Sequence, residues 1–204
     1  MADHVLPVDV SRETLDRLVI LEELTKQWTT KINLIAKGTL SDLWQRHIAD
    51  SAQLIPLLPS DVQHYADLGS GGGFPGLVIA AALAETSPGA RISFVESDAR
   101  KGVFLRQAAR QMGLSIQVLT ARIEQIEPLG ADLMTARALA PLSALLGHAE
   151  RHLVPNGVAL FPKGRQAAKE VEEAREGFRF DLTRTTSQTD GQACILRLEN
   201  ITRA

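Results

Sequence analysis

The sequence predicts an α/β fold in which a mostly parallel, seven-stranded sheet has helices on both faces and follows a helical extension. Residues 64–82 read as a short strand, a glycine-rich loop and an apolar helix. Strand-like and helix-like segments then alternate along the rest of the chain. Before this region, apolar side chains recur at helical spacing. We therefore expect a helical extension over residues 1–60, packed on the sheet, and a sheet domain over residues 61–204.

The composition is that of a globular protein with one domain, or one domain and a small extension. The chain has 204 residues, of which 45% are hydrophobic and 23% are charged, so it is long enough to form a substantial core. The formal net charge of −2 argues against a uniformly basic nucleic-acid-binding protein. It leaves room for a local basic face.

The sequence also indicates the compartment. No apolar run approaches the roughly 18 residues of a membrane span, and the first residues lack the basic flank and apolar core of a secretion signal. We therefore expect a cytoplasmic protein with no membrane partner. Cys194 is the single cysteine and lies in an apolar run, so we expect a buried strand thiol and no intramolecular disulfide.

The extension is expected to contain two helices. Residues 11–28 begin with a serine that can cap a helix and carry apolar side chains at helical period. A second helix is expected over residues 40–56. Lys31, Arg46 and His47 could contact a polyanion, or they could belong to an ordinary solvated helix face.

The sheet domain alternates strands with helices. Strands are expected at about 64–68, 91–96, 115–119, 131–135, 157–161, 178–184 and 192–198, and helices at about 75–86, 99–112, 141–152 and 165–176. In open α/β sheets the ligand lies beyond the carboxyl ends of the strands. The residues that directly follow each strand are therefore the candidates for a functional site.

The glycine loop after the first strand favours a nucleoside ligand that carries an amino acid. Glycines such as Gly69 and Gly71 let the backbone turn sharply and approach a ligand closely. Residues 71–76 formally match the dinucleotide pattern G-x-G-x-x-G. Asp67, however, would repel a pyrophosphate and can accept hydrogen bonds from an ammonium group. S-adenosylmethionine is the common ligand of this kind, and a glycine-rich turn without a ligand is the plain alternative.

Acidic and basic residues follow the next strands. Glu96 ends the second strand, where a carboxylate can accept hydrogen bonds from both ribose hydroxyls. Ile123 and Glu124 follow the third, where a backbone N–H and a carboxylate could recognise an adenine, or could form an exposed turn. Arg137 follows the fourth strand among apolar neighbours, so it needs a ligand, an RNA phosphate or an acidic side chain as its partner.

A local basic rim could contact RNA. Arg100 and Lys101 begin the helix after the second strand, and Lys163 and Arg165 follow the fifth strand. Scattered solubilising charges would give the same pattern. We expect no metal site, because no set of residues has suitable ligand spacing.

With these residues in place, the chain resembles the RsmG family, also called glucose-inhibited division protein B. The resemblance covers nearly the whole chain. It rests on residues 31–35, 46–51, 67–76, 96–101, 135–140 and 161–164. It implies a class I S-adenosylmethionine-dependent methyltransferase, with a Rossmann-like sheet, that methylates N7 of a guanine in bacterial 16S ribosomal RNA. By motif match, the cofactor site would be lined by Gly69, Phe74, Ile123, Glu124 and Arg137, beside Asp67, Gly71 and Glu96.

The implied chemistry requires no catalytic acid or base. Guanine N7 already presents a lone pair and loses no proton on methylation, so catalysis can rest on proximity and orientation. The methylated ring gains positive charge, which a negative or neutral pocket would stabilise. The expected partner is small-subunit ribosomal RNA, the 30S subunit or an assembly intermediate, with no obligate protein partner. The alternatives are a class I methyltransferase with another substrate and a non-catalytic RNA-binding or ribosome assembly factor.

Overall fold

The computed structural model describes residues 4–204 and confirms the α/β class. The strands are β1 (His64–Leu68), β2 (Arg91–Val95), β3 (Gln117–Leu119), β4 (Ala131–Thr135), β5 (Leu153–Lys163), β6 (Phe178–Thr186) and β7 (Cys194–Arg203). They form one seven-stranded sheet in the order β3-β2-β1-β4-β5-β7-β6. Strand β7 runs antiparallel to both of its neighbours, β5 and β6, and the other pairs of neighbouring strands are parallel. All seven predicted strands are present, and several extend beyond the predicted boundaries.

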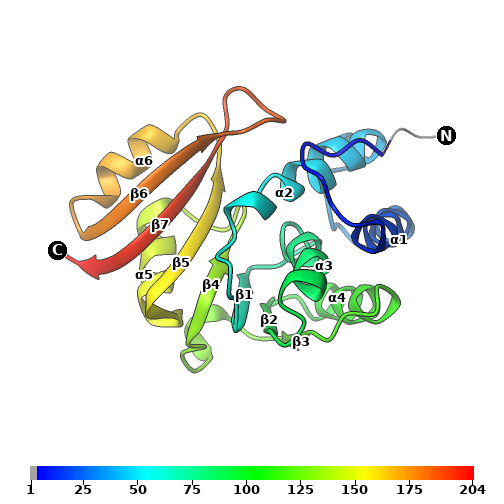
Figure 1. The fold of residues 1–204 in the computed structure, drawn as a ribbon, viewed down its shortest axis with the longest axis horizontal. Helices are drawn as coiled ribbons and strands as arrows, with labels where there is room; N and C mark the ends of the chain where they lie inside the picture. Colours follow the sequence, from blue (N-terminus) through cyan, green and yellow to red (C-terminus); the bar gives the residue numbers. More distant parts are fainter. Residues whose placement is uncertain (1–3) are drawn as a thin grey trace.

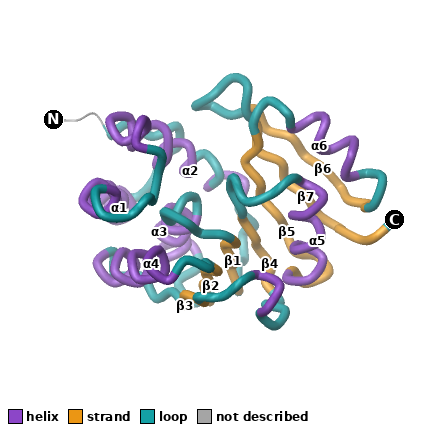
Figure 2. Tube along the Cα trace, turned by 180° about the vertical axis from the view of Figure 1, so that it is seen from behind, coloured by secondary structure: helices purple, strands orange, loops and turns teal. Residues whose placement is uncertain are grey.

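Helices cover both faces of the sheet, as Figures 1 and 2 show. The helices of this domain are α3 (Gly76–Thr86), α4 (Ala99–Gln111), α5 (Leu142–His152) and α6 (Ala167–Ala174). Alternate side chains of β1 face opposite sides of the sheet. Tyr65 packs in the hydrophobic cluster that includes α3 and α4, whereas Ala66 packs in the one that includes α5 and α6. Cys194 is buried at the start of β7, as predicted.

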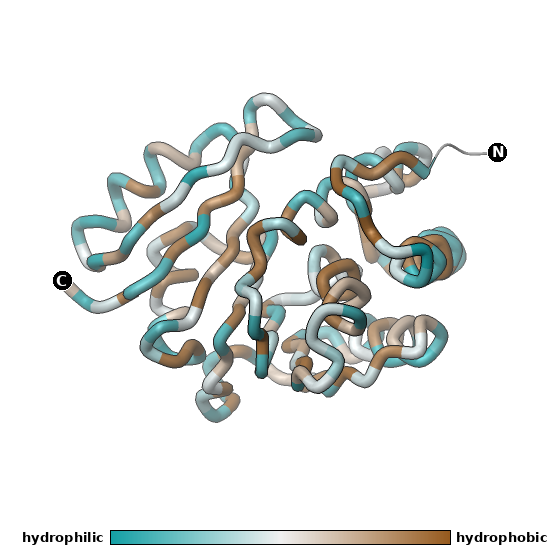
Figure 3. Tube along the Cα trace, viewed as in Figure 1, coloured by the Kyte–Doolittle hydropathy of each residue, from teal (hydrophilic) through white to brown (hydrophobic). Residues whose placement is uncertain are grey.

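The extension begins with α1 (Arg12–Thr29), which packs against α3 and α4. Ser11 caps α1 as predicted, since its hydroxyl accepts a hydrogen bond from the Thr14 backbone N–H. Because α1 covers α3, residues 76–83 of α3 are buried on every side. Figure 3 shows α3 as one of the hydrophobic parts of the chain, in contrast to the hydrophilic turns of α4 and α6. The extension therefore shares a core with the sheet domain, and the division at residue 60 stays a prediction.

The helix predicted over residues 40–56 is only partly correct, because the segment is mostly helical but is not one regular α-helix. The chain forms instead a 3-10 helix (Lys37–Asp42), a π-helix (Trp44–Ala49), the one-turn helix α2 (Asp50–Ala52) and a second 3-10 helix (Ile55–Leu57). The residues of this segment have two different roles. Some are buried in the core, and others form polar contacts with distant parts of the chain, described below. π-helices are rare in proteins, and those that do occur often lie at functional sites.

No helix in residues 4–204 is both long enough and apolar enough to span a membrane.

Candidate active site

The glycine loop lies between the carboxyl ends of β1 and β2. The backbone N–H groups of Gly69 and Ser70 both donate to the Val95 carbonyl, at 2.9 and 3.1 Å. Gly69 has φ 65° and Gly73 has φ 84°. Residues other than glycine rarely adopt such positive φ angles. A Cβ on Gly73 would also collide with the side chain of Leu77. The loop therefore needs glycine for its shape.

Asp67 lies beneath this loop and is 1% exposed. One carboxylate oxygen accepts a hydrogen bond from the Thr135 hydroxyl, which in turn accepts from Tyr65. The other oxygen, Oδ2, is buried without a hydrogen-bond partner within residues 4–204, and a Cβ on Gly76 would approach it to 2.6 Å. Burial raises the pKa of Asp67 to about 6. Its contact with a ligand ammonium stays a prediction.

Glu96 ties the loop to the end of β2. The side chain is 7% exposed, and its Oε2 accepts the Gly71 backbone N–H at 2.8 Å. Its Oε1 accepts the Asp98 backbone N–H at 2.7 Å. Each carboxylate oxygen has two lone pairs, so both can accept a further donor. The hydroxyls of a ribose could donate such hydrogen bonds to Glu96.

The remaining predicted cofactor residues follow β3 and β4. Ile123 is buried and Glu124 is exposed, both in a 3-10 turn (Ile123–Gln125). Phe74 is buried at the end of the glycine loop. Because β3, β2, β1 and β4 are neighbours in the sheet, all the predicted cofactor residues lie along one edge of it. Their roles toward a cofactor stay predictions.

Arg137 pairs with an acidic side chain, which was one of its predicted partners. Its guanidinium donates to Asp50 Oδ2 at 3.2 Å and to His47 Nδ1 at 3.0 Å. It also lies 5.6 Å from the centre of the Phe74 ring. Burial, with Arg137 and Arg46 nearby, lowers the pKa of His47 to about 4. The neutral His47 ring can therefore accept from Arg137 and hold the extension against the glycine loop.

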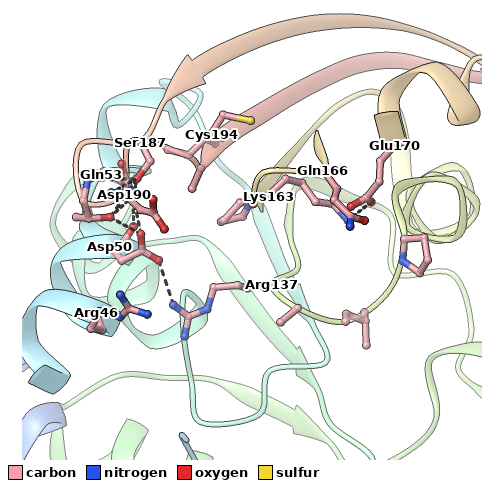
Figure 4. A pocket seen from close by; sticks show the side chains of 18 of the residues that line it. Arg46, Asp50, Gln53, Arg137, Lys163, Gln166, Glu170, Ser187, Asp190 and Cys194 are labelled. Atoms are coloured by element: carbon pink, nitrogen blue, oxygen red, sulfur yellow. Dashed lines mark hydrogen bonds and ion pairs between the residues drawn. The ribbon is translucent and has the colours of Figure 1, made fainter. Parts of the chain in front are cut away.

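A cleft of about 660 Å³ opens beside Arg137 (Figure 4). The extension, the β4–α5 loop, the end of β5, α6 and the β6–β7 loop all contribute to its walls. Of the predicted cofactor residues, only Arg137 lines it. Asp50 joins two of these walls, because its Oδ1 accepts the Thr189 hydroxyl at 2.6 Å. Gln53 donates to Asp50 Oδ1 and to Ser187 and accepts the Gln188 N–H.

The four residues of the predicted basic rim lie at two places, near the ends of β2 and of β5. The Arg100 guanidinium pairs with Asp98. The Lys163 ammonium donates to the Ala140 carbonyl at 2.9 Å and to Glu170 at 2.7 Å, and its side chain is only 10% exposed. Two strands, β1 and β4, separate the ends of β2 and β5, a span of about 14 Å at the usual strand spacing. Lys101 is half-buried and Arg165 is exposed, and RNA contacts by these four residues stay predictions.

Asp50, Gln53 and Thr189 line the cleft but were not among the residues predicted from the sequence. The available signal was the segment 46–51, which carried the family resemblance but was interpreted as a helix face. Its partners lie far along the chain, so spacing could not reveal them. Within residues 4–204, no group of three or more histidine, cysteine or acidic side chains is placed to hold a metal ion.

The comparisons with known proteins settle the family. Residues 14–194 match the model of the GidB family, described as rRNA small subunit methyltransferase G. The chain belongs to this family. A relative named ribosomal RNA small subunit methyltransferase G, from Ruegeria sp. (strain TM1040), is 48% identical over 198 residues, which are 97% of this chain and 96% of the relative. The Rhodospirillum centenum protein of the same name is 49% identical, over 94% and 87% of the two chains.

A solved structure supports the fold predicted for this chain. The crystal structure of M. jannaschii TYW2 in complex with AdoMet superposes with a TM-score of 0.57. It is 13% identical, with 86% of this chain and 80% of that chain covered. The resemblance stated from the sequence is thus confirmed, and so is the class I methyltransferase fold.

Proposed function

We propose that this protein transfers a methyl group from S-adenosylmethionine to N7 of a guanine in small-subunit ribosomal RNA. Membership of the GidB family supports the reaction. The observation that carries it in the structure is the Glu96 carboxylate, buried at the end of β2 and bonded to the glycine loop. This is the position from which a carboxylate binds the ribose of a nucleoside in such sheets.

Different residues along the sheet edge would contact different parts of the cofactor. Glu96 accepts hydrogen bonds from the ribose hydroxyls, and Ile123 and Glu124 recognise the adenine. The loop backbone at Gly69 and Gly71 lies against the cofactor, and the charge of Asp67 attracts its ammonium group. Phe74 and Arg137 close the end that faces the cleft. The unpartnered Asp67 Oδ2 supports this fit.

The chain needs to orient the reactants rather than transfer protons. Bound S-adenosylmethionine supplies an electrophilic methyl group, and guanine N7 supplies the lone pair. No residue has to remove a proton, which agrees with the absence of a predicted catalytic base. Holding the two atoms in line contributes several kcal/mol, up to about 7 to 11 in ideal cases.

The proposed RNA contacts are the phosphates near the sheet edge. Arg100, Lys101, Lys163 and Arg165 would bind them, and the substrate would be small-subunit ribosomal RNA, the 30S subunit or an assembly intermediate in the cytoplasm. No obligate protein partner is proposed. Because Lys163 already has two hydrogen bonds, we expect Arg165 to contribute more phosphate affinity than Lys163.

A methyl-transfer assay tests the function. Labelled S-adenosylmethionine is offered with 30S subunits, and with protein-free 16S RNA, from a bacterial strain that lacks its own enzyme. Product mapping by mass should find 7-methylguanine at a single guanine. Label on protein or a small molecule alone would favour a methyltransferase with another substrate. RNA binding and cofactor binding without transfer would favour an assembly factor.

A further inference from the structure

The cleft next to Arg137 adjoins the glycine loop. Leu139 lines the cleft and also packs on the loop, since a Cβ on Gly69 would approach its Cδ1 to 2.7 Å. Arg137 lines the cleft as well and lies over the Phe74 ring of the loop. A ligand in the cleft would therefore lie directly beside a cofactor on the loop. The volume of about 660 Å³ falls within the roughly 300–1,000 Å³ of small-molecule sites.

Methylation at N7 requires such a concave site. N7 lies on the major-groove edge of guanine, and the major groove of an RNA helix is too deep and narrow for side chains to enter. Enzymes that modify a base therefore take it out of the stack and hold it in a pocket. The target guanine needs a receptor that borders the cofactor.

We propose that this cleft receives the unstacked guanine of the substrate RNA, and that Asp50 is the positioning residue that holds two of its walls together. The proposal rests on the proposed function and names the base-binding part of the same site. Its occupant is a single nucleobase, and the flanking phosphates remain outside the cleft.

The charge of the cleft suits this occupant. Its lining includes the apolar residues Leu139, Pro141, Pro162 and Ile195, which can contact the face of a base. Carboxylates outnumber cations in the lining by four to three. The carboxylates are Asp50, Glu170, Glu173 and Asp190, and the cations are Arg46, Arg137 and Lys163. Most of these charges are paired: Asp50 with Arg137, Glu170 with Lys163, and Glu173 with Lys169, which lies outside the lining. Guanine becomes cationic when N7 is methylated, and a cleft that is close to neutral does not oppose this charge.

Asp50 bonds to two walls of the cleft, beside Gln53, which also bonds to the β6–β7 loop. Its Oδ2 accepts from Arg137, on the cofactor side, and its Oδ1 accepts from Thr189, on the β6–β7 loop. Figure 4 shows Asp50 between Arg137 and the loop residues Ser187 and Asp190. Loss of either contact would leave that wall held by fewer hydrogen bonds, those of Gln53 on the loop side and of His47 on the Arg137 side. Catalysis by orientation of the base is sensitive to such loosening.

A cleft-filling variant tests whether the base enters. Ala193→Trp places an indole on a residue that lines the cleft, whereas Gln192→Trp adds the same group to the exposed neighbour that does not line it. We expect Ala193→Trp to lower methyl transfer to 30S subunits at least a hundredfold, with the calorimetric Kd for S-adenosylmethionine within twofold of wild type. Gln192→Trp should keep both values.

A hydroxyl substitution tests the positioning role of Asp50 and does not alter the volume of the cleft. Thr189→Val removes the hydrogen bond to Asp50 and the hydroxyl contacts with Gln53 and Ser187. We expect kcat/KM for the RNA to fall about tenfold with the cofactor Kd unchanged. Thr189→Ser keeps a hydroxyl and should restore the activity. Thr183→Val, at an exposed position of β6, is the matched control.

The outcomes separate the two proposals. Transfer by Ala193→Trp at the wild-type rate would overturn the cleft as the base site, and so would a parallel loss of cofactor binding. Wild-type values for Thr189→Val, or loss of activity in Thr189→Ser, would overturn the role of Asp50. No transfer by the wild-type chain to any RNA substrate would instead overturn the proposed function itself, and the cleft assignment with it. Thermal unfolding of each variant establishes that it is folded.

Discussion

The two parts of the candidate site are built in different ways. The cofactor edge comes from consecutive strands and loops, and its central contact joins Gly71 and Glu96, only 25 positions apart. The cleft is assembled from distant segments, with Asp50 bonded to Arg137, 87 positions away, and to Thr189, 139 positions away. A substitution in the first part should therefore change cofactor affinity, whereas one in the second should change the use of the RNA.

The largest effect is expected in the glycine loop, for Gly73→Ala. Alanine disfavours the φ of 84°, and its Cβ would collide with Leu77. We expect the free energy of S-adenosylmethionine binding to weaken by about 3 kcal/mol, the upper end of the cost of such backbone strain. Isothermal titration calorimetry measures it. Gly89→Ala is the control, because Gly89 has no atom within 4 Å of an added Cβ, and equal affinities for the two variants would contradict the role of the loop.

A smaller effect is expected for Glu96→Ala. The variant loses the proposed hydrogen bonds to ribose and the anchor for Gly71, so we expect cofactor binding to weaken by about 1.5 to 3 kcal/mol, the scale of a charged hydrogen bond. The KM for RNA at saturating cofactor should stay unchanged. Calorimetry and steady-state kinetics separate the two. Glu176→Ala, at an exposed turn residue, should bind normally, and a normal Kd for Glu96→Ala would refute the ribose assignment.

The difference between local and long-range contacts also explains which features could be predicted from the sequence. The strand, loop and helix over residues 64–86 and the position of Glu96 were predictable, because their signals lie within a few tens of residues and follow the rules of βαβ units. The partner of Arg137 was not, since an arginine among apolar neighbours fits a ligand or a distant carboxylate equally well. The π-helix in the segment that holds Asp50 also escaped prediction, because tertiary contacts rather than apolar period determine its shape.

The ion pair between Asp50 and Arg137 should contribute measurable stability. Its side chains are 21% and 20% exposed, whereas the Arg203–Glu150 pair is 66% and 34% exposed. Double-mutant cycles to alanine, followed by urea unfolding, should give a coupling energy of about 1 to 2 kcal/mol for the first pair. The second should give about 0.5 kcal/mol or less. Equal coupling in the two pairs would show that Asp50 holds Arg137 no better than a surface contact does.

The smallest effect is a pH dependence that separates the two parts of the site. Burial raises the pKa of Asp67 to about 6, whereas that of His47 is lowered to about 4. Between pH 7.5 and 5.5 Asp67 loses most of its charge and His47 stays neutral. If the Asp67 charge attracts the cofactor ammonium, the Kd for S-adenosylmethionine should rise about fourfold over this range.

Asp67→Asn supplies the control, because its cofactor Kd should be higher and nearly constant between pH 7.5 and 5.5. The stability of the protein should respond with the opposite sign. Because the folded-state pKa of Asp67 is raised, its protonation favours the folded state fully below about pH 4, and this contribution is lost as the pH rises through about 6. Lowering the pH should thus weaken cofactor binding, whereas the accompanying protonation of Asp67 should raise the free energy of unfolding. A Kd that rises equally in Asp67→Asn would assign the titration to another group.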